Sequence, residues 1–542
     1  MAVLLAATPA LQPRSRNSRP PQQARWSATR WSLLITALTL LSFGVAGWHP
    51  YAEDGGMYLT RVLLRLNPTL YPRCLPFIVE PLRTSLFEPL LAGMVHLHIA
   101  LPWAMILLQL AALALTLTAA LALMRRITED LQAQLAGIAL LAAWTTVPVA
   151  GTSLLLFDPY LTARTLCAPF TLFAAAFAMD SWGPSRVHSR RPPRGGTRSA
   201  IACAASLLLG FAFHPLMATY GTGLVVMLRL ARTHRATLWM AVASCAALLI
   251  AAAMQLASAP SSAAVLAADT SRYYWFLSRW QWFELLGIIG PAIILLAFAT
   301  QRLANFKPGT RLLARAALGL LASGVLVALC CGQEHFAAHP IARLQPLRVL
   351  WSVYALLPLL LGASLASRAR VLASKQRSQT VRSALRFMPT GVIATTALIF
   401  LLAQCGSFPA SPHIELPGRT NSNPWVQAFV WSRDHTANTA LFALDARYVN
   451  RDGEDAQNFR AISLRSSLPD FSKDGGEAAI RASLADSWLP AAEAQRDLIA
   501  LTPAEREARL RPFAPDWLIL ASTAKTTSPC PYDNGTVKVC RM

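Results

Sequence analysis

The chain consists largely of apolar stretches separated by short polar segments. A membrane-spanning helix needs roughly 20 mostly apolar residues, and stretches near that length recur along the sequence. We therefore predict nine separate spans at residues 31–48, 99–124, 134–151, 165–179, 237–257, 283–300, 316–332, 349–366 and 388–405.

One further apolar segment, residues 199–230, is longer than a single span and is interrupted at His214-Pro215. Arg198 precedes it, and Arg229 and Arg232 close it. Basic residues on both sides imply an even number of crossings. We read this segment as a short hairpin with its turn near His214, which brings the predicted number of spans to eleven.

The positions of the basic residues predict the orientation. With the N-terminus in the cytoplasm, the cytoplasmic segments hold 25 of the 49 Lys and Arg residues and 3 of the 27 Asp and Glu residues. The other face then has 24 of each, so the whole net charge of +22 lies on the cytoplasmic side. This is the positive-inside pattern. It indicates contact with anionic membrane lipids in a bacterial inner membrane, and no nucleic-acid partner.

Composition excludes a purely soluble enzyme, because 54% of the residues are hydrophobic and only 14% are charged, against about 25% charged in soluble domains. We expect a cytoplasmic tail at 1–30, a membrane domain at 31–405 with a first outer loop at 49–98, and an extracytoplasmic soluble domain at 406–542.

The soluble domain is predicted to have a mixed α/β fold. Strands are predicted at 440–446 and 516–522, a helix at 503–511 behind a Thr502/Glu505 capping box, and a hairpin turn at Asn534-Gly535.

Two of the nine cysteines, Cys530 and Cys540, flank the predicted hairpin turn. An oxidising compartment would let them form a disulfide; the alternative is a pair of buried thiols. Six others lie in or at the ends of spans and are interpreted as packing residues, and Cys74 has no evident partner.

Two adjacent carboxylates, Glu53 and Asp54, follow the first span by five residues. A carboxylate beside the bilayer can accept a proton from a hydroxyl nucleophile, or hold a divalent metal or a cationic substrate group. Gly55 and Gly56 follow and would let the backbone approach a neighbour closely, and amphipathic sequence begins at Tyr58. The alternative is a solvated loop in which Asp54 caps a helix.

Three further polar groups stand out before or between spans. Asp158 and Arg164 are the only charges in a long apolar stretch; they pair with each other, or Arg164 holds an anionic group. The His214 turn lies close enough to the preceding span that it is expected below the outer surface, where irregular backbone is tolerated only against protein or a water-filled cavity. His214 then lines that cavity or is a hydrogen-bonded structural histidine.

The segment before the tenth span carries Arg343, Gln345 and Arg348. Two arginines at the outer interface can hold a phosphate by bidentate hydrogen bonds; the alternative is snorkelling to lipid phosphates. The loop at 258–282 is rich in Tyr and Trp, which is typical of an aromatic belt, or of a surface for a lipid tail or sugar ring.

With these elements in view, the sequence resembles the membrane-embedded glycosyltransferases of the GT-C type. The resemblance lies in one span followed by an outer loop with Glu53-Asp54, in the outer-end arginines, in the C-terminal domain, and in the segments HPYAEDGGMYL, DPYLTAR and LQPLR. It implies an all-α polytopic membrane fold and a polyprenyl-phosphate-linked sugar donor used on the extracytoplasmic face. Hexosyl or pentosyl transfer with inversion is implied, and the acceptor is left open.

In that reading, Asp54 orients or deprotonates the acceptor hydroxyl, with Glu53 as the second candidate. Arg343 or Arg348 stabilises the departing phosphate, because negative charge develops there in the transition state. Arg164 is a reserve candidate. No cofactor is certain, and a divalent metal at the acid pair is the one that the residue types allow.

Two other classes of function fit the layout. A lipid or small-molecule transporter or flippase also needs many spans, but favours internal repeats and ionisable groups at mid-membrane, and we see no clear repeat. A non-catalytic envelope scaffold would use residues 442–448 and 459–474 as an interaction surface.

Overall fold

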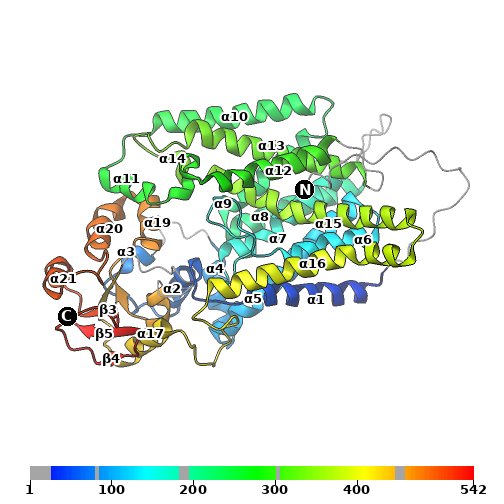
Figure 1. Cartoon of the computed structure of the whole chain (residues 1–542). Helices are drawn as coiled ribbons and strands as arrows, with labels where there is room; N and C mark the ends of the chain where they lie inside the picture. Colours follow the sequence, from blue (N-terminus) through cyan, green and yellow to red (C-terminus); the bar gives the residue numbers. More distant parts are fainter. Residues whose placement is uncertain (1–25, 80–84, 182–193, 301–305, 446–457) are drawn as a thin grey trace, which may run out of the picture.

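The computed structural model describes residues 26–79, 85–181, 194–300, 306–445 and 458–542. Within these residues, long apolar helices form a bundle, and a smaller domain with a sheet packs at one end of it (Figure 1). The chain therefore has the expected fold class, an all-α polytopic membrane domain followed by a C-terminal α/β domain.

Every predicted span coincides over most or part of its length with a helix in the described part of the chain. By length and composition, eight helical stretches can cross a membrane; α6 and α9 are shorter apolar helices, and α7, which contains Arg164 and Asp180, is not among the eight. Eleven crossings therefore stay a prediction. The helices are α1 (Ala28–Ala46), α5 (Leu101–Ile127), α6 (Leu131–Ala143), α7 (Ala163–Ser181), α8 (Arg194–Phe213), α9 (Pro215–Leu230), α10 (Ala236–Ala257), α12 (Trp282–Thr300), α13 (Pro308–Cys331), α15 (Val349–Lys375) and α16 (Gln379–Ser407).

The hairpin predicted at His214 is present, with this one residue between α8 and α9. Gly210, near the end of α8, packs against Cys167, near the start of α7. Arg232, just past α9, donates a hydrogen bond to the Met179 carbonyl near the end of α7. Thus α8 runs antiparallel to α7 and α9 returns alongside it. The reversal occurs because His214 is extended and Pro215 begins a new helix, a position that suits proline.

Helix α15 forms the centre of the bundle and packs against α6, α13 and α16. Most of its residues are buried, as expected for a helix that is apolar on all sides. By contrast, α10 lies at the edge of the bundle (Figure 1) and exposes large apolar side chains such as Leu249 and Leu256. An apolar outer face of this kind suits contact with hydrocarbon.

Short helices connect the spans at the end of the bundle that meets the C-terminal domain (Figure 1). The first outer loop forms α2, whose apolar face packs against α4, and α2 also contacts α18 of the C-terminal domain. These short elements are α2 (Asp54–Leu66), α3 (Leu75–Ile78), α4 (Phe87–His96), α11 (Ala263–Thr270), η2 (Tyr273–Trp275), η3 (Leu277–Arg279), α14 (Pro340–Arg343) and η4 (Pro346–Arg348).

The C-terminal domain is built around a five-stranded sheet in the order β2-β1-β3-β5-β4. Strand β1 pairs in parallel with β2 and β3, and β5 pairs antiparallel with β3 and β4. Its elements are α17 (Pro424–His435), β1 (Leu441–Leu444), α18 (Phe459–Ser463), β2 (Ser466–Ser467), α19 (Lys473–Ile480), α20 (Ala482–Ala494), α21 (Pro503–Leu510), η6 (Arg511–Phe513), β3 (Trp517–Ala521), β4 (Tyr532–Asp533) and β5 (Val537–Arg541).

Side chains alternate between the two faces of β1, as strand geometry requires. Phe442 packs with Phe429 and Phe459 on one face, and Leu441 packs with Leu510 on the other. Both faces are therefore covered by helices. The scaffold surface predicted at 442–448 and 459–474 is wrong at Phe442 and Phe459, because both are core residues; residues 446–448 lie outside the described part.

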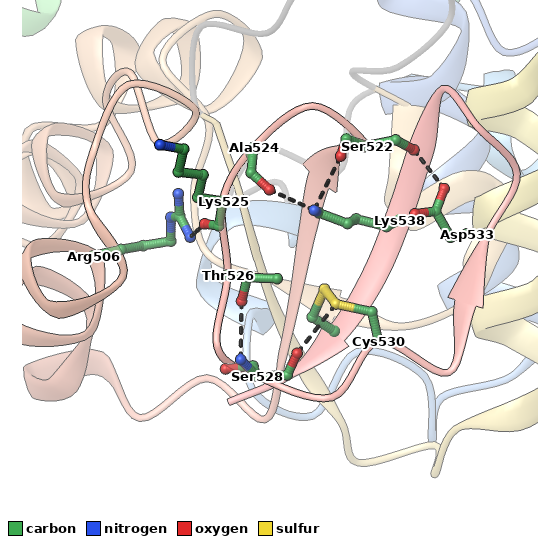
Figure 2. The surroundings of a disulfide bond; sticks show 10 residues. Arg506, Ser522, Ala524, Lys525, Thr526, Ser528, Cys530, Asp533 and Lys538 are labelled. Atoms are coloured by element: carbon green, nitrogen blue, oxygen red, sulfur yellow. Dashed lines mark hydrogen bonds between the residues drawn. A yellow bond between two sulfur atoms is a disulfide. The ribbon is translucent and has the colours of Figure 1, made fainter.

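The strands, the capping box, the hairpin turn and the disulfide predicted for the C-terminal domain are confirmed. Strands β1 and β3 lie within the two predicted ranges, and Thr502 and Glu505 form the capping box of α21. The Asn534-Gly535 turn joins β4 to β5, with a positive φ at the glycine. A disulfide joins Cys530 to Cys540 in β5, and Figure 2 shows its surroundings.

Candidate active site

A cavity of about 1140 Å³ lies between the membrane domain and the C-terminal domain. Its lining includes Glu53 and Asp54 at the start of α2, Asp158 before α7, Arg348 of η4, and Lys473 at the start of α19. We call it the polar cavity. It brings together the acid pair, Asp158 and Arg348 with Tyr273 and Tyr274 of the aromatic loop at 258–282. The C-terminal domain adds Lys473, a charged residue that the sequence analysis did not name.

The segment that precedes the acid pair is bonded to the segment at residues 413–415. The Trp48 N–H donates to the His413 carbonyl, and the Glu415 N–H donates to the Trp48 carbonyl, each at 2.9 Å. The His49 Nδ1 atom lies 2.8 Å from the Glu415 carboxylate. Two segments that are far apart in the sequence are thus joined directly before the acid pair, so Glu53 and Asp54 follow a fixed backbone.

The two glycines after the acid pair are required by close neighbours. A Cβ on Gly55 would lie 2.7 Å from the Pro50 carbonyl oxygen and 3.0 Å from the Tyr160 Cβ, and a Cβ on Gly56 would lie 2.0 Å from the Asn458 Oδ1. Side chains at these positions would clash with backbone and with the C-terminal domain. The expectation that the glycines allow close approach is confirmed.

Asp54 is the first residue of α2 and has opposite charges on two sides. Its Oδ1 lies 2.9 Å from the Lys473 Nζ, and its Oδ2 lies 3.4 Å from an Arg164 nitrogen. Burial alone would raise the pKa of Asp54, but the charges of Lys473 and Arg164 outweigh it and hold that pKa well below its usual range. The carboxylate is therefore ionised at neutral pH.

Behind Asp54 lies a buried ion pair. The Arg164 guanidinium donates two hydrogen bonds to the Asp158 Oδ2, at 2.7 and 3.2 Å. The pairing of Asp158 with Arg164, one of the two expected arrangements, is thus present, and Arg164 reaches Asp54 as well. Because buried charges are costly unless paired, this arrangement fixes the orientation of Arg164 and so restricts the position of Asp54.

Lys473 is the charged residue that the sequence analysis missed. Its Nζ lies 2.7 Å from the Glu53 Oε2 as well as 2.9 Å from Asp54. Burial would lower the pKa of Lys473, but the two carboxylates raise it above its ordinary value. It lies 419 residues from Asp54 along the chain. Nothing in the neighbouring sequence distinguishes this lysine from others in a polar domain, so only the tertiary fold identifies it.

Arg348 and Gln345 have buried polar atoms that are unsatisfied within the described residues, namely the Arg348 Nε and the Gln345 Oε1. A buried polar atom of this kind can accept a water molecule or a ligand as its partner. Arg348 lines the polar cavity and lies within electrostatic range of Arg164 and Asp54. Gln345 does not line the cavity; its backbone carbonyl accepts a hydrogen bond from Tyr220 at 3.0 Å.

Four other predicted residues do not line the polar cavity: Arg164, which lies behind Asp54, and the three that follow. Arg343 donates two hydrogen bonds to the Asp269 carboxylate, at 2.9 and 3.0 Å. Tyr58 packs its ring against Phe87 with the ring centres 5.1 Å apart. His214 accepts a hydrogen bond from the Met217 N–H at 3.3 Å and thereby caps α9, which is the structural alternative, although it lies within electrostatic range of Arg348 and Asp54.

The acid pair was also the predicted place for a divalent metal. Among the described residues, no group of three or more His, Cys, Asp and Glu side chains is placed to hold a metal ion. Glu53 and Asp54 are both bonded to Lys473, so a metal at this pair would have to displace the ammonium group. The metal stays a prediction, and no step below is derived through it.

Several solved structures are similar to this chain. The oligosaccharyltransferase AglB from Archaeoglobus fulgidus, in complex with an inhibitory peptide and a dolichol-phosphate, has a TM-score of 0.48 at 11% identity, covering 91% of this chain and 70% of AglB. The same archaeon's oligosaccharyltransferase in the apo form has a TM-score of 0.47 at 10% identity, covering 92% and 70%. ArnT from Cupriavidus metallidurans, bound to undecaprenyl phosphate, has a TM-score of 0.46 at 12% identity, covering 95% of this chain and 98% of ArnT.

The AglB and ArnT structures each contain a polyprenyl-type lipid phosphate, dolichol-phosphate in the first and undecaprenyl phosphate in the second. No protein-family model matches the chain, and no curated protein matches it. Since the TM-scores lie below 0.5, the function proposed below rests on the residues of this chain.

Proposed function

We propose that this protein is a membrane-embedded glycosyltransferase that moves a sugar from a polyprenyl-phosphate carrier to an acceptor hydroxyl. The observation that carries the proposal is the polar cavity, in which an ionised carboxylate, Asp54, and a half-buried arginine with a buried, unsatisfied nitrogen, Arg348, line one space. A base and an anion site in one cavity are what sugar transfer from a phosphate ester needs.

The cavity lining suits a lipid phosphate. Its lining combines the charged residues with the apolar side chains of Leu154, Leu155 and Phe408. An arginine at such a boundary can bind a phosphate bidentately while the polyprenyl chain contacts apolar surface. The proposed membrane is the bacterial inner membrane, with the N-terminus in the cytoplasm and the cavity on the extracytoplasmic face.

In the proposed reaction, the acceptor oxygen attacks the anomeric carbon as the bond from that carbon to the phosphate oxygen breaks. Asp54 takes the proton of the acceptor hydroxyl. The electron pair of the broken bond goes to the phosphate, which leaves as polyprenyl phosphate with one more negative charge, stabilised by Arg348. Direct displacement inverts the anomeric centre. Asp158 positions Arg164, and Arg164 positions Asp54.

The test is sugar transfer by the full chain in liposomes, with a polyprenyl-phosphate sugar and a panel of lipid, glycan and peptide acceptors. Replacing Asp54 by Asn should reduce transfer by about 10²- to 10⁴-fold. Asp434→Asn is the matched control, because Asp434 is an exposed acid on α17 that pairs with Arg433 and does not line the cavity.

Full activity in Asp54→Asn would remove Asp54 from the mechanism. Movement of a lipid or small molecule across the bilayer, with no transfer of sugar to any acceptor or to water, would instead favour the transporter or flippase class.

A further inference from the structure

The loop that precedes Lys473 is anchored more firmly than a surface lysine needs. The Asp470 carboxylate accepts hydrogen bonds from the backbone N–H groups of Lys473 and Asp474, at 2.6 and 3.1 Å. The Trp488 indole donates to the Asp470 carbonyl at 2.8 Å. Asp474 in turn forms a two-point ion pair with Arg460, each bond 2.8 Å long. The backbone at the start of α19 is therefore fixed within the C-terminal domain.

The membrane domain holds the same loop from the other side. Arg272, which lies between α11 and η2, donates hydrogen bonds to the carbonyls of Phe471 and Ser472, the former at 2.7 Å. Arg272, Phe471, Ser472 and Lys473 all line the polar cavity. The loop is thus held against the cavity wall, and it delivers the lysine side chain to the cavity.

The side chain of Lys473 can change partners while this backbone stays in place. A lysine carries its charge on a flexible four-carbon chain and can exchange partners without a change in backbone. Its present partners, Glu53 and Asp54, are partly exposed to the cavity. An anion that enters the cavity beside Arg348 would compete with them for the ammonium group.

We propose that Lys473 is a second phosphate-binding residue, contributed by the C-terminal domain, and that it passes from the acid pair to the donor phosphate when the donor binds. This rests on the function proposed above. In the empty cavity the ammonium neutralises Glu53 and Asp54. With the donor bound it faces the phosphate, and Asp54 is left free to accept a hydrogen bond from the acceptor hydroxyl.

The charge balance of the reaction fits this exchange. The donor is a phosphodiester with one negative charge, and the leaving polyprenyl phosphate carries two, because it keeps the electron pair of the broken carbon–oxygen bond. The added charge develops in the cavity that Arg348 and Lys473 both line, so on this proposal both stabilise the transition state more than the bound donor. The proton lost by the acceptor resides on Asp54.

The exchange also means that Asp54 can act as the base only after the donor has bound. While Lys473 is on the acid pair, Asp54 is a weak base, and an acceptor that arrives first is not activated. The charged and titratable groups that face Asp54 are Glu53, Asp158, Tyr160, Arg164, His214, Arg348 and Lys473. Of these, Lys473 is the one placed on the C-terminal domain, so docking of that domain controls the site.

The experiment compares Lys473→Met with Arg73→Met in the full chain. Arg73 is the matched control because it joins the first outer loop to the C-terminal domain through Asp516 at 2.7 Å and does not line the cavity. Lys473→Met should lower kcat by about 10²-fold and weaken binding of undecaprenyl phosphate about tenfold, a shift that equals about 1.4 kcal/mol. Arg73→Met should leave both within twofold of the wild type.

The pH profile of kcat/KM separates this role from a merely structural one. At low pH, kcat/KM falls as Asp54 becomes protonated, and we call this fall the acid limb. Without Lys473 the acid limb should move to higher pH, because a cation that favours the ionised carboxylate is gone. Lys473→Arg should restore most of the binding of undecaprenyl phosphate and keep the limb in place, since it keeps a cation.

If Lys473→Met matched Arg73→Met in kcat, in affinity for undecaprenyl phosphate and in the acid limb, the inference would be overturned, while the proposed transferase activity would stand. A wild-type chain that transfers no sugar would overturn the proposed function first. Binding of undecaprenyl phosphate would then still show whether Lys473 is an anion-binding residue.

Discussion

Asp269 accepts hydrogen bonds from two nitrogens of Arg343, with an Nε–Oδ1 distance of 3.0 Å and a terminal nitrogen–Oδ2 distance of 2.9 Å. His339 lies 3.1 Å from the same carboxylate, which is fully buried. Arg343 therefore ties the α14 turn to α11. Arg348 follows five residues later, so this pair supports the backbone that carries the arginine of the polar cavity.

Replacing Arg343 by Met should destabilise the protein without removing the anion site. The change leaves the Asp269 carboxylate buried with only His339 as its partner, and breaking a buried pair costs about 3–5 kcal/mol. Thermal unfolding in detergent measures this. The double variant Arg343→Met, Asp269→Asn should recover much of the loss; a double variant as unstable as the single one would argue against the pair as the cause.

Replacing Arg348 by Met should reduce sugar transfer and leave stability nearly unchanged, the opposite of the result expected for Arg343. Arg348 has a buried nitrogen that no group in the described residues satisfies, so its loss removes little native interaction. Sugar transfer should fall by about 10²-fold, while the melting temperature stays near that of the wild type. If Arg348→Met instead lowers the melting temperature and keeps its affinity for polyprenyl phosphate, the arginine is structural.

Replacing Gly56 by Ala should loosen the contact between α2 and the C-terminal domain. The new Cβ would lie 2.0 Å from the Asn458 Oδ1, so one of the two elements must shift. Gly93→Ala on α4 is the control, because its Cβ would meet nothing within 4 Å, and alanine favours a helix by about 1 kcal/mol over glycine. We expect lower stability and transfer for Gly56→Ala, and a neutral or raised melting temperature for Gly93→Ala.

Stability should depend on pH through Asp470. Burial and the neighbouring charge of Asp474 raise the pKa of Asp470 to about 6, against about 3.9 in an unfolded chain. Because the folded pKa is the higher one, the protonated form favours folding. Its contribution is complete below about pH 4 and is lost as the pH rises through about 6.

Asp470→Asn should therefore be more stable than the wild type at pH 7.5, by about 1–3 kcal/mol, and the two should converge near pH 4. The amide keeps an oxygen that can accept the backbone N–H groups of Lys473 and Asp474. Thermal unfolding from pH 4 to pH 8 measures the difference, with the exposed acid variant Asp486→Asn expected to follow the wild type. Parallel curves for Asp470→Asn and the wild type would contradict the assignment.

Local signals in the sequence were enough to predict much of this fold. Apolar stretches predict the helices because a span must satisfy its backbone internally, and His214-Pro215 predicts the hairpin because proline begins a helix more readily than it continues one. Asp54, Asp158 and Arg348 could be singled out because charges are scarce in apolar sequence. Helix ends were less predictable: the span predicted at 134–151 ends as α6 at Ala143.

What the sequence could not show were partners brought together by tertiary structure. Arg343 and Arg348 look alike in the sequence, yet among the described residues Arg343 pairs with a buried acid, Asp269 on α11, and Arg348 lines the polar cavity. Lys473 is unremarkable in its own segment and acquires its meaning from Glu53 and Asp54, some 420 residues earlier. Periodicity and composition describe how a segment is buried, and carry no information on which distant side chain it faces.

The contact between Lys473 and the acid pair has a consequence for biosynthesis. All the predicted spans precede residue 406, so a nascent chain can complete its membrane insertion before the lysine has been translated. The site is then completed only after the C-terminal domain has been synthesised and has folded against the membrane domain. A product released early from the ribosome would keep the contact between Arg164 and Asp54 but would lack Lys473 at the acid pair, and on our proposal it would bind the donor weakly.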